Sequence, residues 1–530
     1  RLDNADVRYF NVPVAAGPAP AGDTGGHWQE AAGNATGDFS GVGFLFAEKI
    51  AARNGLKVGV IDASRGGTGI ESWMSREALL KNPLLTDKVL EFDRLSYSTD
   101  IYEKLPPGRL LPEPDELILN MLSEHRAGLP ANKGLELGFA EPEFDDRHWR
   151  TVELPDSWNL AGYNHAGIFW YRITIDLPQE AAGRELELSL GAVDKGDITY
   201  FNGKEIGRTG DGIDMSYWNH PRVYKVCGEL VRAGCNTIAV RAASLFAIAT
   251  QGGLTGPAEM MFARVGDLKI PLDVEWRCHM EYNAGNKLSE ALVMSGPGEP
   301  HSQHILFDNM IAPLIPYAIR GVLWYQGECN AISQAAGYCD LLQGLIRDWK
   351  YRWGQVKMDF IVIQLPGYQA KRLVSPHSQW ALLREAQMQC GEPLVVTCDA
   401  GAENDLHPRD KSIVAIRAAD IADALLNGRE PVYSPQLLSV TRDRLKIQVK
   451  FDTYGSKLEF RGDPDGFAVG EKNTLYRAKA VIISDDTVEL SHPNLKDPEI
   501  IYYGWSNFPT GNLYNTEGLP AAPFRYCLVP

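Results

Sequence analysis

The sequence predicts an α/β protein whose parallel sheet is interrupted by an all-β stretch and followed by a smaller β domain. Apolar runs at 56–61 and 360–365 are typical of buried parallel strands, and helical patterns accompany both. From about 135 to 285 the pattern changes to short alternating runs separated by turn residues. After Pro431 the alternation is again β-like.

These changes predict where the domains begin and end. At 530 residues the chain is too long for a single hydrophobic core. We expect the first part of the α/β domain over 1–134, an inserted β-sandwich over 135–285, the second part of the α/β domain over 286–430 and a C-terminal β domain over 431–530.

The α/β segments contain residues that predict where helices and strands begin and end. A helix is predicted over 39–54, where Asn54-Gly55 provides a C-terminal stop. Residues 80–130 look helical and polar, with a break at 106–108. The second part predicts a strand at 394–397 and helices at 338–349, 380–390 and 412–426.

The β stretch contains a clear hairpin signal. Residues 191–207 hold two strands joined by Asn202-Gly203, a dipeptide that favours tight hairpin turns. Further strands are predicted at 149–154, 167–177, 185–190 and 237–242.

Bulk properties exclude several classes of function. The net charge of −16 argues against a nucleic-acid or anionic-membrane partner and fits a neutral or cationic ligand. No apolar run is long enough to span a membrane. The eight cysteines have no metal-binding spacing, so we expect no metal site. The sequence has neither a signal peptide nor an initiator Met, so we expect that an upstream segment is removed or left out.

The most informative stretch is Gln326-Gly327-Glu328, which with Asn330 follows the apolar run at 319–323. Open α/β sheets carry their chemistry at the carboxyl ends of strands, and Gly327 allows a tight turn there. The alternative is a strand-to-helix loop in which Asn330 caps the next helix.

Two other polar clusters follow predicted strands. The strand at 56–61 leads into a glycine-rich turn at 62–69, and the strand at 394–397 leads to Asp399 and a loop with Asp405 and His407. Histidine is the usual proton shuttle in acyl transfer, and a nearby acid can orient it. A surface histidine in a polar loop is the alternative. Three such clusters at one sheet edge favour an active site.

Together these segments resemble the sialate O-acetylesterase family, a branch of the SGNH hydrolases that includes bacterial carbohydrate acetylesterases. The likeness rests on the ordered blocks Gly66-Gly67-Thr68, Ile70-Glu71-Ser72-Trp73, Trp324-Tyr325-Gln326-Gly327-Glu328, Arg384-Glu385-Ala386-Gln387, Asp405-Leu406-His407-Pro408, Tyr503-Gly504-Trp505-Ser506-Asn507 and 518–525. It implies a flavodoxin-like three-layer α/β/α SGNH domain with a β-sandwich insert. The insert itself resembles the galactose-binding-like sandwiches that accompany many glycoside hydrolases.

The resemblance implies a role for each site residue. His407 would be the general base, Gly67 the backbone oxyanion donor, and Gln326 a further amide donor or a support for the serine, with Asn330 beside it. The acid that orients His407 is left open between Asp405, Glu328 and Asp399. Many SGNH branches place that acid three residues before the histidine, where this chain has Asn404.

The resemblance also exposes a gap, because the family's nucleophilic serine lies in a Gly-Gln-Ser-Asn type motif that residues 1–40 lack. Ser40 falls at a predicted helix start. We expect either a missing or separate N-terminal segment that carries the serine, or a true loss of it. Ser64 only half resembles a nucleophile elbow. Cys329 is better explained as a small buried residue.

The implied function is a carboxylic ester hydrolase that removes O-acetyl groups from sugars, of sialic acid or hemicellulose type, by serine acyl-enzyme chemistry without cofactor. The alternative is an inactive carbohydrate-binding or scaffold protein. The expected partner is an acetylated mono-, oligo- or polysaccharide, with no nucleic acid or membrane. Family habit implies a secreted or periplasmic protein.

Overall fold

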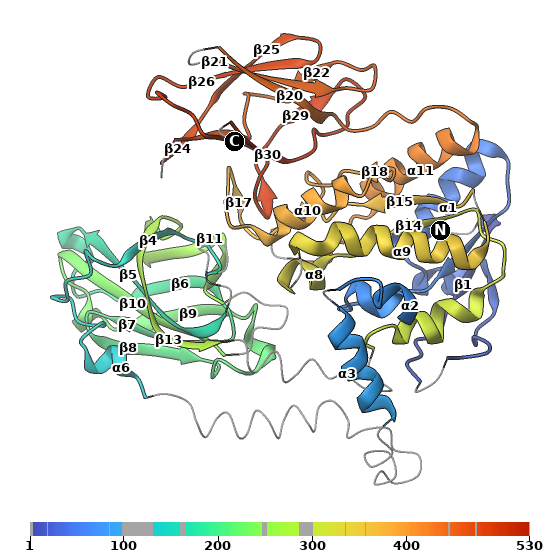
Figure 1. Ribbon diagram of the computed structural model, residues 1–530. Helices are drawn as coiled ribbons and strands as arrows, with labels where there is room; N and C mark the ends of the chain where they lie inside the picture. Colours follow the sequence, from blue (N-terminus) through green and yellow to red (C-terminus); the bar gives the residue numbers. More distant parts are fainter. Residues whose placement is uncertain are drawn as a thin grey trace. The chain divides into compact units, whose positions relative to one another are not determined.

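The computed structural model describes residues 4–17, 20–83, 85–97, 131–158, 163, 165–245, 252–285, 300–333, 335–355, 357–403, 405–443, 446–471 and 474–528. The chain divides into two compact units (Figure 1). One unit combines Arg1–Pro107 with Met294–Pro530, and the other is Gly108–Val293.

The first unit contains two three-stranded sheets. One has the order β2-β1-β3, in which β1 and β3 are parallel, and the other has the order β14-β15-β18, all parallel. Their bounds are β1 Asn4–Asn11, β2 Trp28–Ala31, β3 Val58–Asp62, β14 Gly321–Trp324, β15 Asp359–Ile363 and β18 Leu394–Val395. The parallel strands expected near 56–61 and 360–365 are confirmed as β3 and β15.

Helices follow the strands as expected for an α/β protein. They are α1 Gly41–Asn54, η2 Ile70–Trp73, α2 Arg76–Leu79, α3 Thr86–Tyr97, α8 Glu328–Ser333, α9 Tyr338–Trp353, α10 Gln379–Gln389 and α11 Ser412–Leu426. Ser40 caps α1, since its Oγ accepts the Gly43 N–H, and Gly55 ends it with a left-handed φ of 64°. The helices expected beyond residue 97, over 98–130, lie outside the described residues.

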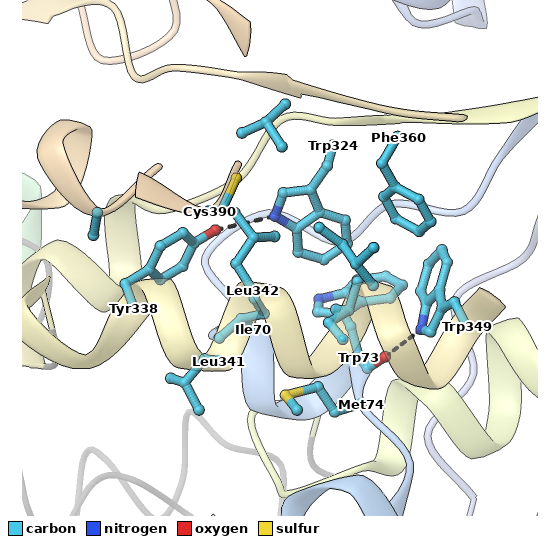
Figure 2. Close-up of a cluster of buried hydrophobic side chains, with 14 of the residues drawn as sticks. Ile70, Trp73, Met74, Trp324, Tyr338, Leu341, Leu342, Trp349, Phe360 and Cys390 are labelled. Carbon is cyan, nitrogen blue, oxygen red and sulfur yellow. Dashed lines mark hydrogen bonds between the residues drawn. The ribbon is translucent and has the colours of Figure 1, made fainter. Parts of the chain in front are cut away.

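Indole and phenol side chains dominate the core between α9, η2 and the β14-β15 sheet (Figure 2). Trp324 donates its indole N–H to the Tyr338 hydroxyl at 3.0 Å, and Trp349 donates to the Trp73 carbonyl at 3.0 Å. These bonds satisfy polar atoms that burial would otherwise penalise. The first bond holds the end of β14, directly before Gln326, against α9, and the second holds η2 against α9.

The strands of the two three-stranded sheets differ in how deeply they are buried. Phe360, Ile361, Val362 and Ile363 of β15, which has neighbours on both sides, are all buried. Four of the five residues of β3 and two of the four residues of β14 are half-buried. Within the described ranges, β3 pairs only with β1, and β14 pairs only with β15.

The second unit is built from two antiparallel sheets whose apolar side chains share one core. The first has the order β4-β13-β5-β10-β7-β8, with β4 Arg150–Glu153, β13 Glu275–Gly285, β5 Ala166–Leu177, β10 Gly234–Ser244, β7 Gly196–Phe201 and β8 Lys204–Thr209. The second has the order β12-β11-β6-β9, with β12 Leu268–Pro271, β11 Leu254–Val265, β6 Leu186–Val193 and β9 Pro221–Val226.

The expected hairpin is confirmed in this unit. Strands β7 and β8 pair antiparallel, and Asn202 and Gly203 between them have φ of 48° and 80°. Two positive φ values in succession fit the tight turn that Asn-Gly predicts.

After α11 the first unit continues as β structure. One sheet has the order β20-β21-β26-β25 and another has the order β24-β23-β27-β30. Their bounds are β20 Gln436–Asp443, β21 Lys446–Asp452, β23 Phe467–Glu471, β24 Thr474–Arg477, β25 Lys479–Ser484, β26 Thr487–Ser491, β27 Ile500–Tyr503 and β30 Phe524–Cys527. We call this segment, residues 431–530, the C-terminal β segment.

Two general features concern the whole chain. All eight cysteines lie in described ranges, and none of them forms a disulfide. Among the helices that the structure describes, none is long and apolar enough to cross a membrane.

Candidate active site

The glycine turn after β3 is exposed and its backbone is accessible. Gly67 has a φ of 78°, a left-handed value that favours glycine, and no heavy atom lies within 4 Å of where a Cβ on Gly66 would be. Buried Thr68 stabilises the turn. Its hydroxyl donates to the Arg65 carbonyl at 2.8 Å and accepts the Trp73 indole N–H at 3.0 Å. A rigid turn with accessible N–H groups is the geometry that an oxyanion donor requires.

The turn after β14 is joined to this glycine turn by a side chain. Gln326 donates from Nε2 to the Thr68 carbonyl at 3.0 Å and to Asn330 Oδ1 at 2.8 Å. Its Oε1 accepts the Tyr338 hydroxyl at 2.7 Å. Both amide hydrogens of Gln326 are therefore engaged within the protein, which favours a positioning role over direct contact with substrate.

Asn330 completes this link, and the helix-capping alternative is wrong for it. Helix α8 begins at Glu328, so Asn330 lies inside the helix and not at its cap. Its buried amide accepts the Ile70 N–H at 2.9 Å and donates to Glu71 Oε2 at 2.9 Å. A Cβ on Gly69 would lie 2.5 Å from Glu71 Oε2, so a larger residue there would displace the carboxylate that Asn330 holds.

Helix α10 supports the Gln326–Glu328 turn from the other side. Gln387 donates to the Gln326 carbonyl at 3.1 Å and accepts the Leu365 N–H at 3.1 Å. A Cβ on Gly327 would lie 2.4 Å from Leu383 Cδ2, so the bare glycine backbone lies directly against α10. The Gln387 role went unpredicted, although the Arg384–Gln387 block was part of the family resemblance.

His407 lies exposed in the loop before α11, and Glu328 is the carboxylate whose charge is coupled to it. Burial raises the pKa of Glu328, while its own backbone N–H and the nearby His407 and Lys411 side chains oppose that rise. The His407 loop thus lies within electrostatic range of Glu328.

The other two candidate acids have different partners. Asp405 accepts the backbone N–H of His407 through Oδ1 at 2.8 Å, so its carboxylate shapes the turn that presents the histidine. Asp399 forms a two-point ion pair with Arg417, with N–O distances of 2.6 and 2.7 Å, and also accepts the Tyr514 hydroxyl at 3.2 Å. These contacts favour Glu328 over Asp399 as the acid beside His407.

The two in-chain nucleophile candidates are Ser64 and Cys329. Ser64 donates its hydroxyl to Asp62 Oδ1 at 2.7 Å, and Asp62 also accepts the Tyr9 hydroxyl at 2.6 Å. Burial and the nearby carboxylates of Glu71 and Glu328 raise the pKa of Cys329 to about 11, which keeps its thiol neutral.

Two histidines near the glycine turn were missed, because no motif marks them. His301 is exposed, and its Cε1 lies 3.9 Å from the position of a Cβ on Gly67. His304 is buried. Its Nδ1 shares a hydrogen bond with Asp308 Oδ2 at 2.7 Å, and its backbone N–H donates to the Glu71 carbonyl at 3.0 Å.

Across the described ranges, no group of three or more His, Cys, Asp or Glu side chains could hold a metal ion.

Comparisons with known proteins show first a class of enzyme, and then a family, that part of this chain is similar to. Residues 298–419 match the model of the family described as carbohydrate esterase, sialic acid-specific acetylesterase. This stretch contains Gln326, Glu328, Asn330 and His407. The predicted resemblance to the sialate O-acetylesterase family is confirmed by this match.

Curated relatives match over part of their length. The chain is 30% identical to the sialate O-acetylesterase of Mus musculus over 137 residues, which are 22% of this chain and 25% of that protein. It is 28% identical to the Homo sapiens sialate O-acetylesterase over 150 residues, which are 25% of this chain and 29% of that protein. The matched part thus spans between a quarter and a third of the length of these relatives.

A solved structure matches over the whole chain. The crystal structure of a carbohydrate acetylesterase from Xanthomonas citri aligns with a TM-score of 0.55 and 20% identity, covering 100% of this chain and 74% of that one. At this identity the likeness shows the fold alone, an α/β hydrolase-like fold.

Proposed function

We propose that the protein is a carbohydrate O-acetylesterase that works through a serine acyl-enzyme. One observation carries the proposal: a hydrogen bond from Gln326 to the Thr68 carbonyl joins the glycine turn to the Gln326–Glu328 turn, which is far away in sequence, and the His407 loop lies within electrostatic range of Glu328. A base, an orienting acid and backbone N–H donors in one place suit acyl transfer.

Each group then has a step. His407 takes the proton of the serine hydroxyl as it attacks the acetyl carbonyl, and returns a proton to the leaving sugar oxygen. Glu328 stabilises the imidazolium that forms, with Asp405 holding the loop in place. The Gly67 N–H stabilises the tetrahedral oxyanion, a contribution of about 3 kcal/mol for such a donor. Gln326 and Asn330 hold the two turns in register.

We propose further that the serine comes from a polypeptide segment outside residues 1–530. The half-buried strands β3 and β14 each have a neighbour on one side only among the described residues, whereas β15 is fully covered. A strand inserted beside β3 would be parallel to it and would end at the edge where Gly67 and Gln326 lie. Its next residue would then be the nucleophile that His407 serves.

The proposed substrate is an O-acetylated sugar of the sialic acid or hemicellulose type, and the proposed location is secreted or periplasmic. Both proposals rest on the family match over residues 298–419 and on the similarity to sialate O-acetylesterases. The domain division at 134, 285 and 430, with an SGNH domain interrupted by a galactose-binding-like sandwich, is proposed on the same basis. It is supported by the two shared-core sheets of the second unit.

A serine-directed fluorophosphonate probe tests the proposal on the full-length gene product. We expect labelling of one serine, mapped by peptide mass to a segment outside residues 1–530, and hydrolysis of 4-nitrophenyl acetate that the label abolishes. Labelling at Ser64 would contradict the segment proposal. Absence of both labelling and hydrolysis would contradict the esterase and favour the carbohydrate-binding alternative.

A further inference from the structure

We infer that Asn507, in the C-terminal β segment, is a positioning residue for His407, acting through the loop at 367–372. The inference rests on the proposed function, since it assigns His407 its role as base. It gives Asn507 a positioning role that involves no contact with substrate.

Asn507 is buried and bonded on every side. Its Nδ2 donates to Gln369 Oε1 at 2.7 Å, and its Oδ1 accepts the Ser378 hydroxyl at 2.6 Å. Its carbonyl accepts Arg384 Nη2 at 2.8 Å and the Tyr368 N–H at 3.3 Å. One residue thus connects the C-terminal β segment to α10 and to the 367–372 loop.

Gln369 is the residue on which this connection acts. It has a φ of 69°, a left-handed value that costs free energy for a residue with a side chain. Its side chain is held by Asn507, and its backbone N–H donates to the Glu403 carbonyl at 3.1 Å. The bond to Asn507 therefore stabilises the conformation that directs this N–H to Glu403.

Direct packing carries the same connection. A Cβ on Gly367 would lie 2.2 Å from Phe508 Cδ2, and a Cβ on Gly401 would lie 2.0 Å from the Gly367 carbonyl oxygen. Short parallel pairings join β17 Lys371–Arg372 to β28 Phe508–Pro509, and β16 Gly367–Tyr368 to β19 Gly401–Ala402. Three segments are therefore stacked at glycine contact distance.

The last segment of this stack leads directly to the base. Glu403 lies two residues before Asp405, whose carboxylate bonds the backbone N–H of His407 at 2.8 Å. A shift in the 367–372 loop would move Glu403 and, with it, the turn that presents the imidazole. A displacement of the order of 1 Å in catalytic geometry lowers turnover by up to about 100-fold.

The test compares Asn507→Ala and Asn507→Asp with Asn512→Ala in the full-length protein. Asn507→Asp keeps an acceptor for Ser378 but loses the N–H that holds Gln369. Asn512 is the matched control: it is an asparagine of the same segment whose amide bonds the carbonyls of Arg461 and Asp463 at 2.9 and 2.7 Å. The readouts are kcat and KM with 4-nitrophenyl acetate and hydrogen exchange of the peptide covering 400–407.

We expect both Asn507 variants to lower kcat about 10-fold with KM within about 2-fold, and to speed exchange in 400–407. Asn512→Ala should change neither. Unchanged exchange in 400–407 in a folded Asn507→Ala variant overturns the inference, as does faster exchange with unchanged kcat. If the wild-type protein has no esterase activity, the proposed function fails, and the exchange comparison alone then supports or overturns the coupling.

Discussion

At the scale of single residues, the site is defined by amide and glycine positions that leave little freedom. Gln326 bonds the Thr68 carbonyl, Asn330 bonds Glu71 of η2, and Gly327 lies against Leu383 with no room for a Cβ. The catalytic candidate Glu328 therefore lies among residues that hold the turn and do no chemistry themselves.

Gly327→Ala tests this constraint. The new Cβ would have to displace Leu383, and φ of 154° is rarely adopted by residues with a side chain, so we expect a loss of about 1–3 kcal/mol in the free energy of unfolding. Esterase activity should fall as well. Urea denaturation measures the first effect, with Gly337→Ala as control, because nothing lies within 4 Å of a Cβ there. Equal stability of the two variants would contradict the packing argument.

Glu328→Gln tests the charge coupling to His407 through pH. Burial raises the folded-state pKa of Glu328 above its ordinary value of 4.5, so the folded protein binds this proton more tightly and loses stability as pH rises through that pKa. The neutral Gln variant should have the higher Tm at pH 7, and the difference should vanish below about pH 4.5. Its kcat should fall at least about 10-fold, because the imidazolium loses its partner. A lower Tm at pH 7 would contradict this account.

At the scale of elements, α10 joins the segment after β15, the C-terminal β segment and the turn after β14. Buried Arg384 donates to the carbonyls of Leu365, Pro366, Ser506 and Asn507 at 2.6–2.8 Å, and Gln387 holds the Gln326 carbonyl. Burial lowers the pKa of Arg384 to about 10, yet the guanidinium remains charged at neutral pH. Two motif blocks that the sequence shows far apart thus meet at one side chain.

Arg384→Lys tests whether this contact needs the planar guanidinium. A lysine ammonium cannot reach all four carbonyls, so we expect a loss of about 3 kcal/mol in unfolding free energy. The same change at Arg347, which is exposed on α9, should cost less than about 0.5 kcal/mol. Chemical denaturation compares the two variants. Equal losses of unfolding free energy would contradict the need for a guanidinium at position 384.

Sequence patterns predicted the elements better than their connections. The period of the apolar residues gave α1, α11 and β15 within about two residues, because local packing alone decides those elements. The pattern could not show that Asn330 bonds Ile70 or that Asp399 is taken by Arg417, because these contacts depend on the tertiary fold. Glu328 was predicted only as one of three acids for the same reason.

At the scale of the whole molecule, the second unit has a core and buried charges of its own. Lys195 and Asp194 form a fully buried pair at 3.1 Å, and Asp194 also accepts the Gly252 N–H at 2.7 Å. Arg222 and Asp197 form another at 2.9 Å. Such pairs depend on the folding of this unit and involve no residue of the candidate site.

Lys195→Met tests the independence of this unit. Removing the cation leaves Asp194 charged and buried, so we expect the second unit to lose about 3–5 kcal/mol of stability. Calorimetry should show one of two transitions shifted to lower temperature, with hydrolysis of 4-nitrophenyl acetate unchanged at 25 °C. If the whole protein unfolded in one transition that shifts as a unit, or if activity were lost, the two cores would not be independent.

The most direct test of the central claim is acetate release from an O-acetylated sugar by the full-length protein, compared with its His407→Ala variant. His377→Ala, an exposed histidine of the same unit, is the matched control. We predict acetate release by the wild-type protein and by His377→Ala. In His407→Ala we predict a kcat that is at least about 1,000-fold lower. Release that is equally fast without His407, or no release by the wild-type protein, would contradict the account.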